Sequence, residues 1–169
     1  KAILKAKELI KLVGLDESYL DKSPFELSGG EMRKVALCGV LALEPKVLIL
    51  DEPTVALDYQ SREEIMAMVK RLKEEFDMTI VLVTHNMDYV LEYADKVFVL
   101  KNGEISFEGK VEDLFLNEQV LKENSLELPG VLKFYKKLEA NNIVLDVFPR
   151  KYEELINALK NKIGSSRNE

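Results

Sequence analysis

Four consecutive apolar residues between two prolines limit the folds open to this chain. The run extends from Val47 to Leu50, with Pro45 shortly before it and Pro53 shortly after it. A run this short and this uniformly apolar is typical of a strand covered on both faces, as in a parallel sheet. Two acids, Asp51 and Glu52, follow it directly. The run therefore predicts a buried strand that brings two carboxylates to its carboxyl end.

The rest of the chain alternates between helical and strand patterns. Residues 79–84 are rich in β-branched side chains and predict a second strand, and Asn102-Gly103 predicts a hairpin turn between two more. The alternation predicts an α/β fold. In chain order, the expected helices cover residues 1–13, 28–42, 61–76, 87–94, 111–123, 129–141 and 150–162. The expected strands cover residues 47–50, 79–84, 96–100 and 104–108. Residues 16–24 are expected to be loop, and residues 164–169 are expected to be a frayed end.

The helix expected over 28–42 opens with a capping box and contains a glycine. Ser28 and Glu31 have the Ser-x-x-Glu spacing in which each side chain accepts a hydrogen bond from the backbone N–H of the other residue. Gly39 inside the helix costs about 1 kcal/mol relative to alanine. We therefore expect close backbone packing at Gly39.

Composition excludes several classes of protein. The chain has 169 residues, of which 47% are apolar and 32% charged, so it is neither collagen-like nor intrinsically disordered. Its net charge of −6 disfavours a protein that tracks nucleic-acid phosphates. Its single cysteine, Cys38, cannot form an internal disulfide and fits a reducing compartment. The longest apolar run, Val35 to Leu43, is far shorter than the roughly 20 residues that a membrane-spanning helix needs.

Two stretches have the residue types of a phosphate site. Leu27 to Glu31 reads Leu-Ser-Gly-Gly-Glu, so two glycines stand at a helix start, where exposed N–H groups and the helix dipole favour an anion. An ordinary capped helix explains the same residues. Asp51 and Glu52 point to opposite sides if the strand continues through both, so one can hold a metal while the other addresses a water. A pair of solvated acids is the alternative.

Two further stretches also have both a functional and a purely structural explanation. His85, the only histidine, follows the strand expected over 79–84 and belongs at the carboxyl edge of the sheet, where ligands of α/β proteins bind. A structural histidine is the alternative. Val55 to Asp58 is a tight segment after a proline, and a simple turn with Asp58 capping the next helix also explains it. The order and spacing of all four features weaken these alternatives jointly.

From about Ser23 to Gly109 the sequence resembles the ATP-binding cassette (ABC) ATPases. LSGGE resembles the signature motif of that family, VLILDE its Walker B motif, VALD its D-loop, and His85 its switch histidine. The stretch FELSGGEMRKVALCGVLALEPKVLILDEPT, the strand within TIVLVTH and the tail after Leu126 resemble the ATPases of energy-coupling factor (ECF) transporters, which drive bacterial micronutrient uptake.

The resemblance implies a role for each matching residue. Glu52 would polarise the attacking water and His85 would contact the γ-phosphate of ATP, so these two are the candidate catalytic residues. Asp51 would orient Mg²⁺, usually through water, and Asp58 would communicate across a dimer of ATPases. The candidate ATP-binding residues, which would act on ATP held by the partner subunit, are Ser28, Gly29, Gly30 and Glu31. Two positions depart from the family pattern: Glu31 stands where glutamine is commoner, and Val55 where a smaller or polar residue is commoner.

The phosphate-binding loop of such ATPases does not occur in this sequence. The pattern Gly-x-x-x-x-Gly-Lys-Ser/Thr is not met, because only Gly109 precedes a lysine and Val111 follows that lysine. The resemblance therefore implies an incomplete P-loop NTPase-like ABC ATPase core, its carboxyl-terminal half, over residues 1–126, with an ECF-type helical extension over 127–169. We expect the natural protein to carry a further amino-terminal half, and the strands over 79–84 and 96–100 to lack the neighbour between them.

The resulting expectation is the ATP-hydrolysing subunit of a bacterial ECF-type ABC importer that powers uptake of a vitamin or metal ion. ATP and Mg²⁺ are the implied cofactors, and this piece alone is not expected to hydrolyse ATP. The implied partners are a second ABC ATPase subunit, identical or different, a transmembrane coupling subunit and a substrate-binding membrane subunit, but no nucleic acid. The implied location is the cytoplasmic face of the membrane. The alternatives are a soluble ABC ATPase of DNA repair or translation and a non-catalytic ABC partner module.

Overall fold

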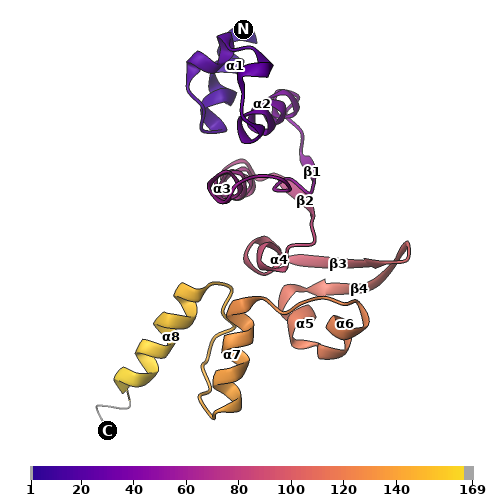
Figure 1. Cartoon of the computed structure of the whole chain (residues 1–169), viewed down its shortest axis with the longest axis vertical. Helices are drawn as coiled ribbons and strands as arrows, with labels where there is room; N and C mark the ends of the chain where they lie inside the picture. The colour runs from indigo at the N-terminus through magenta and orange to yellow at the C-terminus, as the bar shows by residue number, and fades with distance from the viewer. Residues whose placement is uncertain (1, 166–169) are drawn as a thin grey trace. The chain divides into compact units, whose positions relative to one another are not determined.

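A computed structural model describes residues 2–165 of the chain. They form two compact units, one up to His85 and one from Asn86 on, which we describe separately. The first residue of the helix expected over 1–13, and residues 166–169 of the expected frayed end, lie outside the described residues. Figure 1 shows the elements in chain order from indigo to yellow.

The first unit contains helices on a short parallel sheet. Its elements are α1 (Ala2–Leu12), the 3₁₀ helices η1 (Glu17–Asp21) and η2 (Pro24–Glu26), α2 (Gly29–Leu41), β1 (Val47–Asp51), α3 (Tyr59–Phe76) and β2 (Thr79–Val83). The core is aliphatic: Leu48 of β1 is buried with Leu37 and Leu41 of α2 and with Ile65 and Val69 of α3. In Figure 1, α3 lies beside β2.

The two strands of this unit end at the same edge. β1 and β2 pair in parallel, with Val47 opposite Thr79 and Asp51 opposite Val83. Because parallel strands bring their carboxyl ends together, the residues after Asp51 and after Val83 are neighbours in space. The structure thus confirms the expected α/β fold and the expected position of the two acids at the carboxyl end of the first strand.

The expectation that the apolar run is covered on both faces is wrong for this chain. Leu48 is 3% exposed, but Ile49, which points to the opposite face, is 67% exposed. Val81 and Val83 of β2 are also exposed. The physical reason is that α2 and α3 supply apolar side chains to only one face of the two-stranded sheet.

The polar stretch expected to be loop over 16–24 contains short helical turns. Asp16 caps η1 by accepting a hydrogen bond from the Ser18 backbone, and Ser23 caps η2. Both η1 and η2 are short pieces of 3₁₀ helix, and a helix this short carries no apolar periodicity. For that reason the sequence pattern does not distinguish these turns from loop.

The expectation of close packing at Gly39 is also wrong. A Cβ atom built on Gly39 meets nothing within 4 Å, so that part of α2 faces open space. Close packing occurs instead at Gly30, where a Cβ would lie 2.9 Å from the Ser61 hydroxyl of α3. The glycine that packing requires is therefore the one in the first turn of the helix.

The second unit combines a hairpin with short helices. Its elements are α4 (Met87–Tyr93), β3 (Lys96–Lys101), β4 (Glu104–Lys110), α5 (Val111–Leu116), α6 (Glu118–Glu123), α7 (Gly130–Ala140) and α8 (Tyr152–Ser165). The antiparallel hairpin turns at Asn102-Gly103, both with positive φ, as expected. The hairpin and the last two helices share one core, because Val99 of β3 belongs to the same buried cluster as Leu132 of α7 and Leu155 of α8.

Two expectations for this unit need correction. The helix expected over 111–123 breaks at Asn117, which leaves the helical conformation and caps α6 by accepting a hydrogen bond from the Val120 backbone. The sequence predicts a frayed end from residue 164, but residues 164 and 165 are the last two residues of α8. Among residues 2–165, none of the helices has both the length and the apolar character that crossing a membrane requires.

Candidate functional site

The end of β1 positions the two acids differently. Asp51 is the last residue of the strand, whereas Glu52 has left it with φ of 44°, in the left-handed region. The Glu52 backbone N–H still donates to the Val83 carbonyl at 2.9 Å. The strand therefore does not continue through both acids, and the strict alternation of strand side chains does not apply to them.

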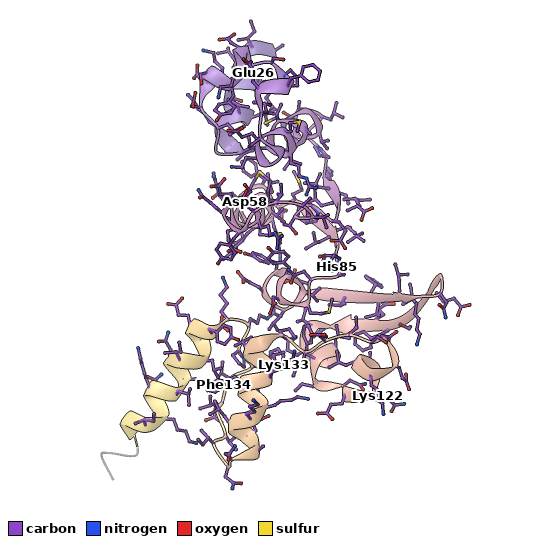
Figure 2. All side chains as sticks on the ribbon, viewed as in Figure 1. Glu26, Asp58, His85, Lys122, Lys133 and Phe134 are labelled. Carbon is purple, nitrogen blue, oxygen red and sulfur yellow. The ribbon has the colours of Figure 1, made fainter. Side chains whose placement is uncertain are left out.

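Glu52 and His85 meet at this edge of the sheet. The Glu52 carboxylate oxygen Oε1 lies 2.6 Å from the His85 ring nitrogen Nδ1 and accepts from the His85 backbone N–H at 3.0 Å. The Glu52 side chain is 31% exposed and the His85 ring 81% exposed, so the contact is open to solvent. Figure 2 labels His85 just after β2. The structure thus brings together the two residues predicted to be catalytic.

The geometry sets the hydrogen-bonding capacity of the imidazole. An ionised carboxylate only accepts hydrogen bonds, so with ionised Glu52 the proton of the contact belongs to Nδ1 of His85. The other ring nitrogen, Nε2, then accepts in the neutral ring and donates in the imidazolium. The pair can therefore orient a water through the carboxylate and contact an anion through the imidazolium.

Asp51 does not join a metal cluster. Nowhere in residues 2–165 do three or more His, Cys, Asp or Glu side chains lie together as a metal site. One exposed carboxylate at the strand end still suits Mg²⁺, because this ion commonly binds one or two carboxylates and takes its other ligands from substrate phosphates and water.

The start of α2 is a complete capping box, as the sequence predicts. The Ser28 hydroxyl accepts from the Glu31 backbone N–H at 3.3 Å, and Glu31 Oε2 accepts from the Ser28 backbone N–H at 2.7 Å. Glu31 Oε1 accepts from the Tyr19 hydroxyl at 2.5 Å. The hydrogen bond from Tyr19, followed by those from Ser28, lowers the pKa of Glu31 to about 2.

The glycines of the predicted signature motif lie close to the predicted D-loop segment and to the helix that follows it. Gly29 and Gly30 are the first two residues of α2, where backbone N–H groups lack intrahelical acceptors. Gly30 is buried against Ser61, which donates from its hydroxyl to the Asp58 carboxylate at 2.7 Å. Asp58 also accepts from the Ser61 backbone at 2.9 Å, and this backbone hydrogen bond is the main cause of its lowered pKa. Asp58 is therefore the N-cap of α3, as predicted, and Figure 2 labels it at that helix start.

A depression of about 350 Å³ lies over this junction. Its floor includes an ion pair between the buried Lys34 ammonium of α2 and Glu64 of α3, 2.5 Å apart. The residues that line it are Gly14, Leu15, Ser28, Gly30, Glu31, Lys34, Asp58, Gln60, Ser61 and Glu64. The predicted signature and D-loop residues thus form one surface, and Glu52 and His85 belong to another part of the same unit.

Sequence reasoning missed several residues of this site. Arg33 donates to the backbone carbonyls of Glu52 and Pro53, and Tyr19 holds Glu31. Ser61 stands three residues after Asp58, the spacing of a helix cap, so this pair could have been found from the sequence. Nothing in the local pattern indicates the contacts of Arg33 or Tyr19, since both depend on tertiary packing.

The chain is similar to known ABC proteins in sequence. The family described as ABC transporter matches residues 2–55. The energy-coupling factor transporter ATP-binding protein EcfA2 of Enterococcus faecalis is 50% identical over 158 residues, which cover 94% of this chain and 55% of that protein. The protein of the same name from Bacillus subtilis is 49% identical over 136 residues, covering 80% and 49%. This chain therefore spans about half the length of the curated relatives it matches.

Solved structures agree with the sequence relatives. The protein cbiO1 from Clostridium perfringens, described as part of the ABC transporter complex cbiONQ, matches with a TM-score of 0.62 and 37% identity over 79% of this chain and 53% of that one. An ATP-binding cassette in a dimeric post-hydrolysis state with ADP and Pi matches with a TM-score of 0.57 and 36% identity, over 64% and 46%. Over its matched length, this chain is therefore similar in sequence and in fold to part of known ABC transporter proteins, among them energy-coupling factor transporter ATP-binding proteins.

Proposed function

We propose that this chain is the carboxyl-terminal part of the ATP-hydrolysing subunit of a bacterial ECF-type importer, which powers uptake of a vitamin or metal ion. The observation that carries the proposal is the contact between Glu52 and His85 at the shared edge of β1 and β2. The names of the relatives support the transporter class. We further propose that residues 1–126 belong to the ATPase core and that 127–169 form a family-specific extension.

The chemistry assigned to the pair follows from its geometry. Glu52 polarises the attacking water through its carboxylate, and His85 contacts the γ-phosphate through Nε2, the ring nitrogen that does not face Glu52. Phosphoryl transfer needs positioning and charge stabilisation more than covalent help from the protein. An acid and an imidazole fixed 2.6 Å apart supply both.

Asp51 is the proposed magnesium ligand of this chain, directly or through water. When bound, Mg²⁺ neutralises charge on the phosphate oxygens. Asp51 lies next to Glu52 in the sequence and ends the same strand, so the metal ligand and the acid that orients water are held by one element.

The second surface, at the start of α2, serves the nucleotide of a partner subunit. Ser28 supplies a hydroxyl, and Gly29 and Gly30 supply first-turn N–H groups without intrahelical acceptors, which suits a phosphate at a helix N-terminus. Glu31 supports this surface by fixing the Ser28 backbone. Asp58 of the D-loop stretch accepts from the Ser61 hydroxyl, which packs beside Gly30, and from this position it communicates across the dimer of ATPases.

The complete protein supplies what these residues lack. Nothing in this sequence matches the loop that cradles the β-phosphate, so we propose that the rest of the protein provides it. The partners are a second ATPase subunit, a transmembrane coupling subunit and a substrate-binding membrane subunit. The working location is the cytoplasmic face of the membrane.

The proposal is tested by reconstitution. The complete protein is assembled with its membrane subunits in vesicles, and phosphate release and uptake of labelled vitamins and transition-metal ions are measured with ATP and Mg²⁺. We expect ATP-dependent uptake of one cargo class, and no phosphate release by the 169-residue chain alone. Sustained turnover by that chain alone, or an assembled complex that neither hydrolyses ATP nor transports, would contradict the proposal.

A further inference from the structure

The backbone at Glu52 has a conformation that requires support. Its φ of 44° lies in the left-handed region, which residues other than glycine, asparagine and aspartate seldom adopt. Such a conformation persists where the surroundings hold it on several sides. The contacts around Glu52 therefore indicate which residues fix the direction of its side chain.

Three groups hold the backbone of Glu52. Its N–H donates to the Val83 carbonyl at 2.9 Å, and its carbonyl accepts from the Val55 N–H at 3.2 Å. The third group is the Arg33 guanidinium, whose NH1 lies 3.4 Å from the Glu52 carbonyl and also donates to the Pro53 carbonyl. Two of these groups belong to the backbone, and the third, the Arg33 guanidinium, belongs to a side chain of α2.

The chemistry of arginine suits this position. A guanidinium is planar, permanently charged and carries five donors in a rigid fork, so one side chain can hold two neighbouring carbonyls. Arg33 is half-buried, which strengthens a charge-assisted hydrogen bond relative to one in water. A lysine carries three rotatable donors on a compact, flexibly tethered ammonium, so it would hold the same two carbonyls less firmly.

We propose that Arg33 is a positioning residue that holds the Glu52 backbone so that the carboxylate stays in contact with His85. This rests on the proposed function, in which Glu52 is the acid that orients the attacking water. Without Arg33, the Glu52–Pro53 backbone relaxes and the carboxylate spends less time against the imidazole. Arg33 belongs to the signature helix, so the helix that serves the partner's nucleotide also supports the acid that acts on this subunit's own nucleotide.

The kinetic test uses the complete protein assembled with its partner subunits. Arg33→Met removes the donors at similar side-chain length, and Arg33→Lys keeps the positive charge and an ammonium donor group without the rigid fork. We expect kcat to fall about tenfold or more in Arg33→Met and less in Arg33→Lys, with the KM for ATP changed by less than about twofold, since misplacing a catalytic group affects turnover rather than substrate binding. The matched control is Arg71→Met, which removes an exposed arginine of α3 paired with Glu75, and it should leave kcat unchanged.

A second readout does not depend on ATP hydrolysis. The imidazole resonances of His85, assigned by their loss in His85→Gln, report its contact with Glu52. Arg33→Met should shift them in the same direction as Glu52→Gln does, and Arg71→Met should leave them in place. If the wild-type complex hydrolyses no ATP, the proposed function fails, and these resonances still decide the inference.

Two results would overturn the inference. One is an Arg33→Met protein with wild-type kcat and wild-type His85 resonances. The other is an Arg33→Met protein whose rate falls only in proportion to its loss of folded protein, together with an Arg33→Lys protein that is folded and fully active. The unfolding midpoint of each variant, measured alongside, separates these results from the expected one.

Discussion

Two glycines of α2 differ in what surrounds them, and single substitutions should separate them. Gly39 faces open space, so Gly39→Ala should raise the free energy of unfolding by about 0.5–1 kcal/mol by restricting the unfolded chain. A Cβ atom at Gly30 would lie 2.9 Å from the Ser61 hydroxyl, so Gly30→Ala should lower the free energy of unfolding. Urea unfolding of both variants of the complete protein measures the two effects.

The cause of the Gly30 effect can be isolated. Ser61→Gly removes both the hydroxyl and the Cβ that a methyl group at Gly30 would meet at 2.9 and 3.1 Å. Adding Ser61→Gly to Gly30→Ala should therefore recover part of the lost stability. If Gly30→Ala and Gly39→Ala have the same effect on unfolding, the packing described at the start of α2 is wrong.

The pKa of Glu31 predicts a pH dependence of stability. It is about 2 in the folded chain, chiefly because Tyr19 donates to the carboxylate, against an ordinary value of about 4.3. A lowered folded pKa means that the contribution is full above about pH 4.5 and is lost as the pH falls towards about 2. Tyr19→Phe should raise the pKa of Glu31 towards its ordinary value, so the variant should lose less stability than the wild type over this range.

Urea unfolding of the complete protein and its Tyr19→Phe variant at several pH values between about 5 and 2 measures the difference. Glu17, whose pKa is also lowered to about 2 by Lys11 and Lys7, is present in both proteins, so the comparison isolates Glu31. Equal losses of stability in the wild type and Tyr19→Phe would contradict the role given to the tyrosine.

At the scale of elements, one arginine anchors α8 within the second unit. Arg150 donates to the Ala94 carbonyl at 2.9 Å and to Glu112 at 2.6 Å, and lowers the pKa of Glu112. Arg150→Met should loosen the start of α8 by about 1–2 kcal/mol, because it leaves a partly buried carboxylate without its partner.

Hydrogen exchange of the α8 amides measures this loosening. Lys133→Met is the matched control, since the pair of Lys133 with Glu127 is 3.4 Å long and its side chains are 55% and 88% exposed. The control should leave exchange unchanged, because exposed pairs contribute little. Faster exchange in both variants, or in neither, would remove Arg150 from this role.

The helix starts were predictable from the sequence because side-chain caps mark them. Ser28 and Asp58 each precede a helix and accept from its first turn, as their spacing indicates. The break at Asn117 could not be predicted from the sequence, because apolar residues continue on either side of it and a single asparagine is tolerated within a helix. Whether a helical pattern bends or breaks at such a residue depends on the packing of the two halves.

The candidate site was predictable as a list of residues, not as a set of contacts. The strand pattern places Glu52 and His85 at one edge, and the structure confirms that they meet. The left-handed conformation of Glu52 and the hydrogen bonds from Arg33 come from tertiary contacts between α2 and the segment after β1. Residues on separate elements determine both, so no local pattern contains them.

For the whole chain, the exposed face of the first sheet predicts its behaviour in solution. Ile49 is 67% exposed, and Val47, Val81 and Val83 are between 42% and 52% exposed, so β1 and β2 present an open apolar surface. The 169-residue chain alone should bind the dye ANS and unfold over a broad transition, whereas the complete protein should bind little dye and unfold more sharply. Calorimetry and dye fluorescence on both proteins measure this. A sharp, dye-free transition of the chain alone would contradict it.

The role in ATP hydrolysis that we propose for Glu52 is tested most directly by Glu52→Gln in the complete, assembled protein. The rate of phosphate release should fall by at least about 100-fold while ATP binding persists, because the substitution keeps the shape of the side chain and removes the charge that polarises water. Glu75→Gln, which alters an exposed carboxylate of α3, should leave the rate unchanged. A Glu52→Gln protein that hydrolyses ATP at the wild-type rate would contradict the account.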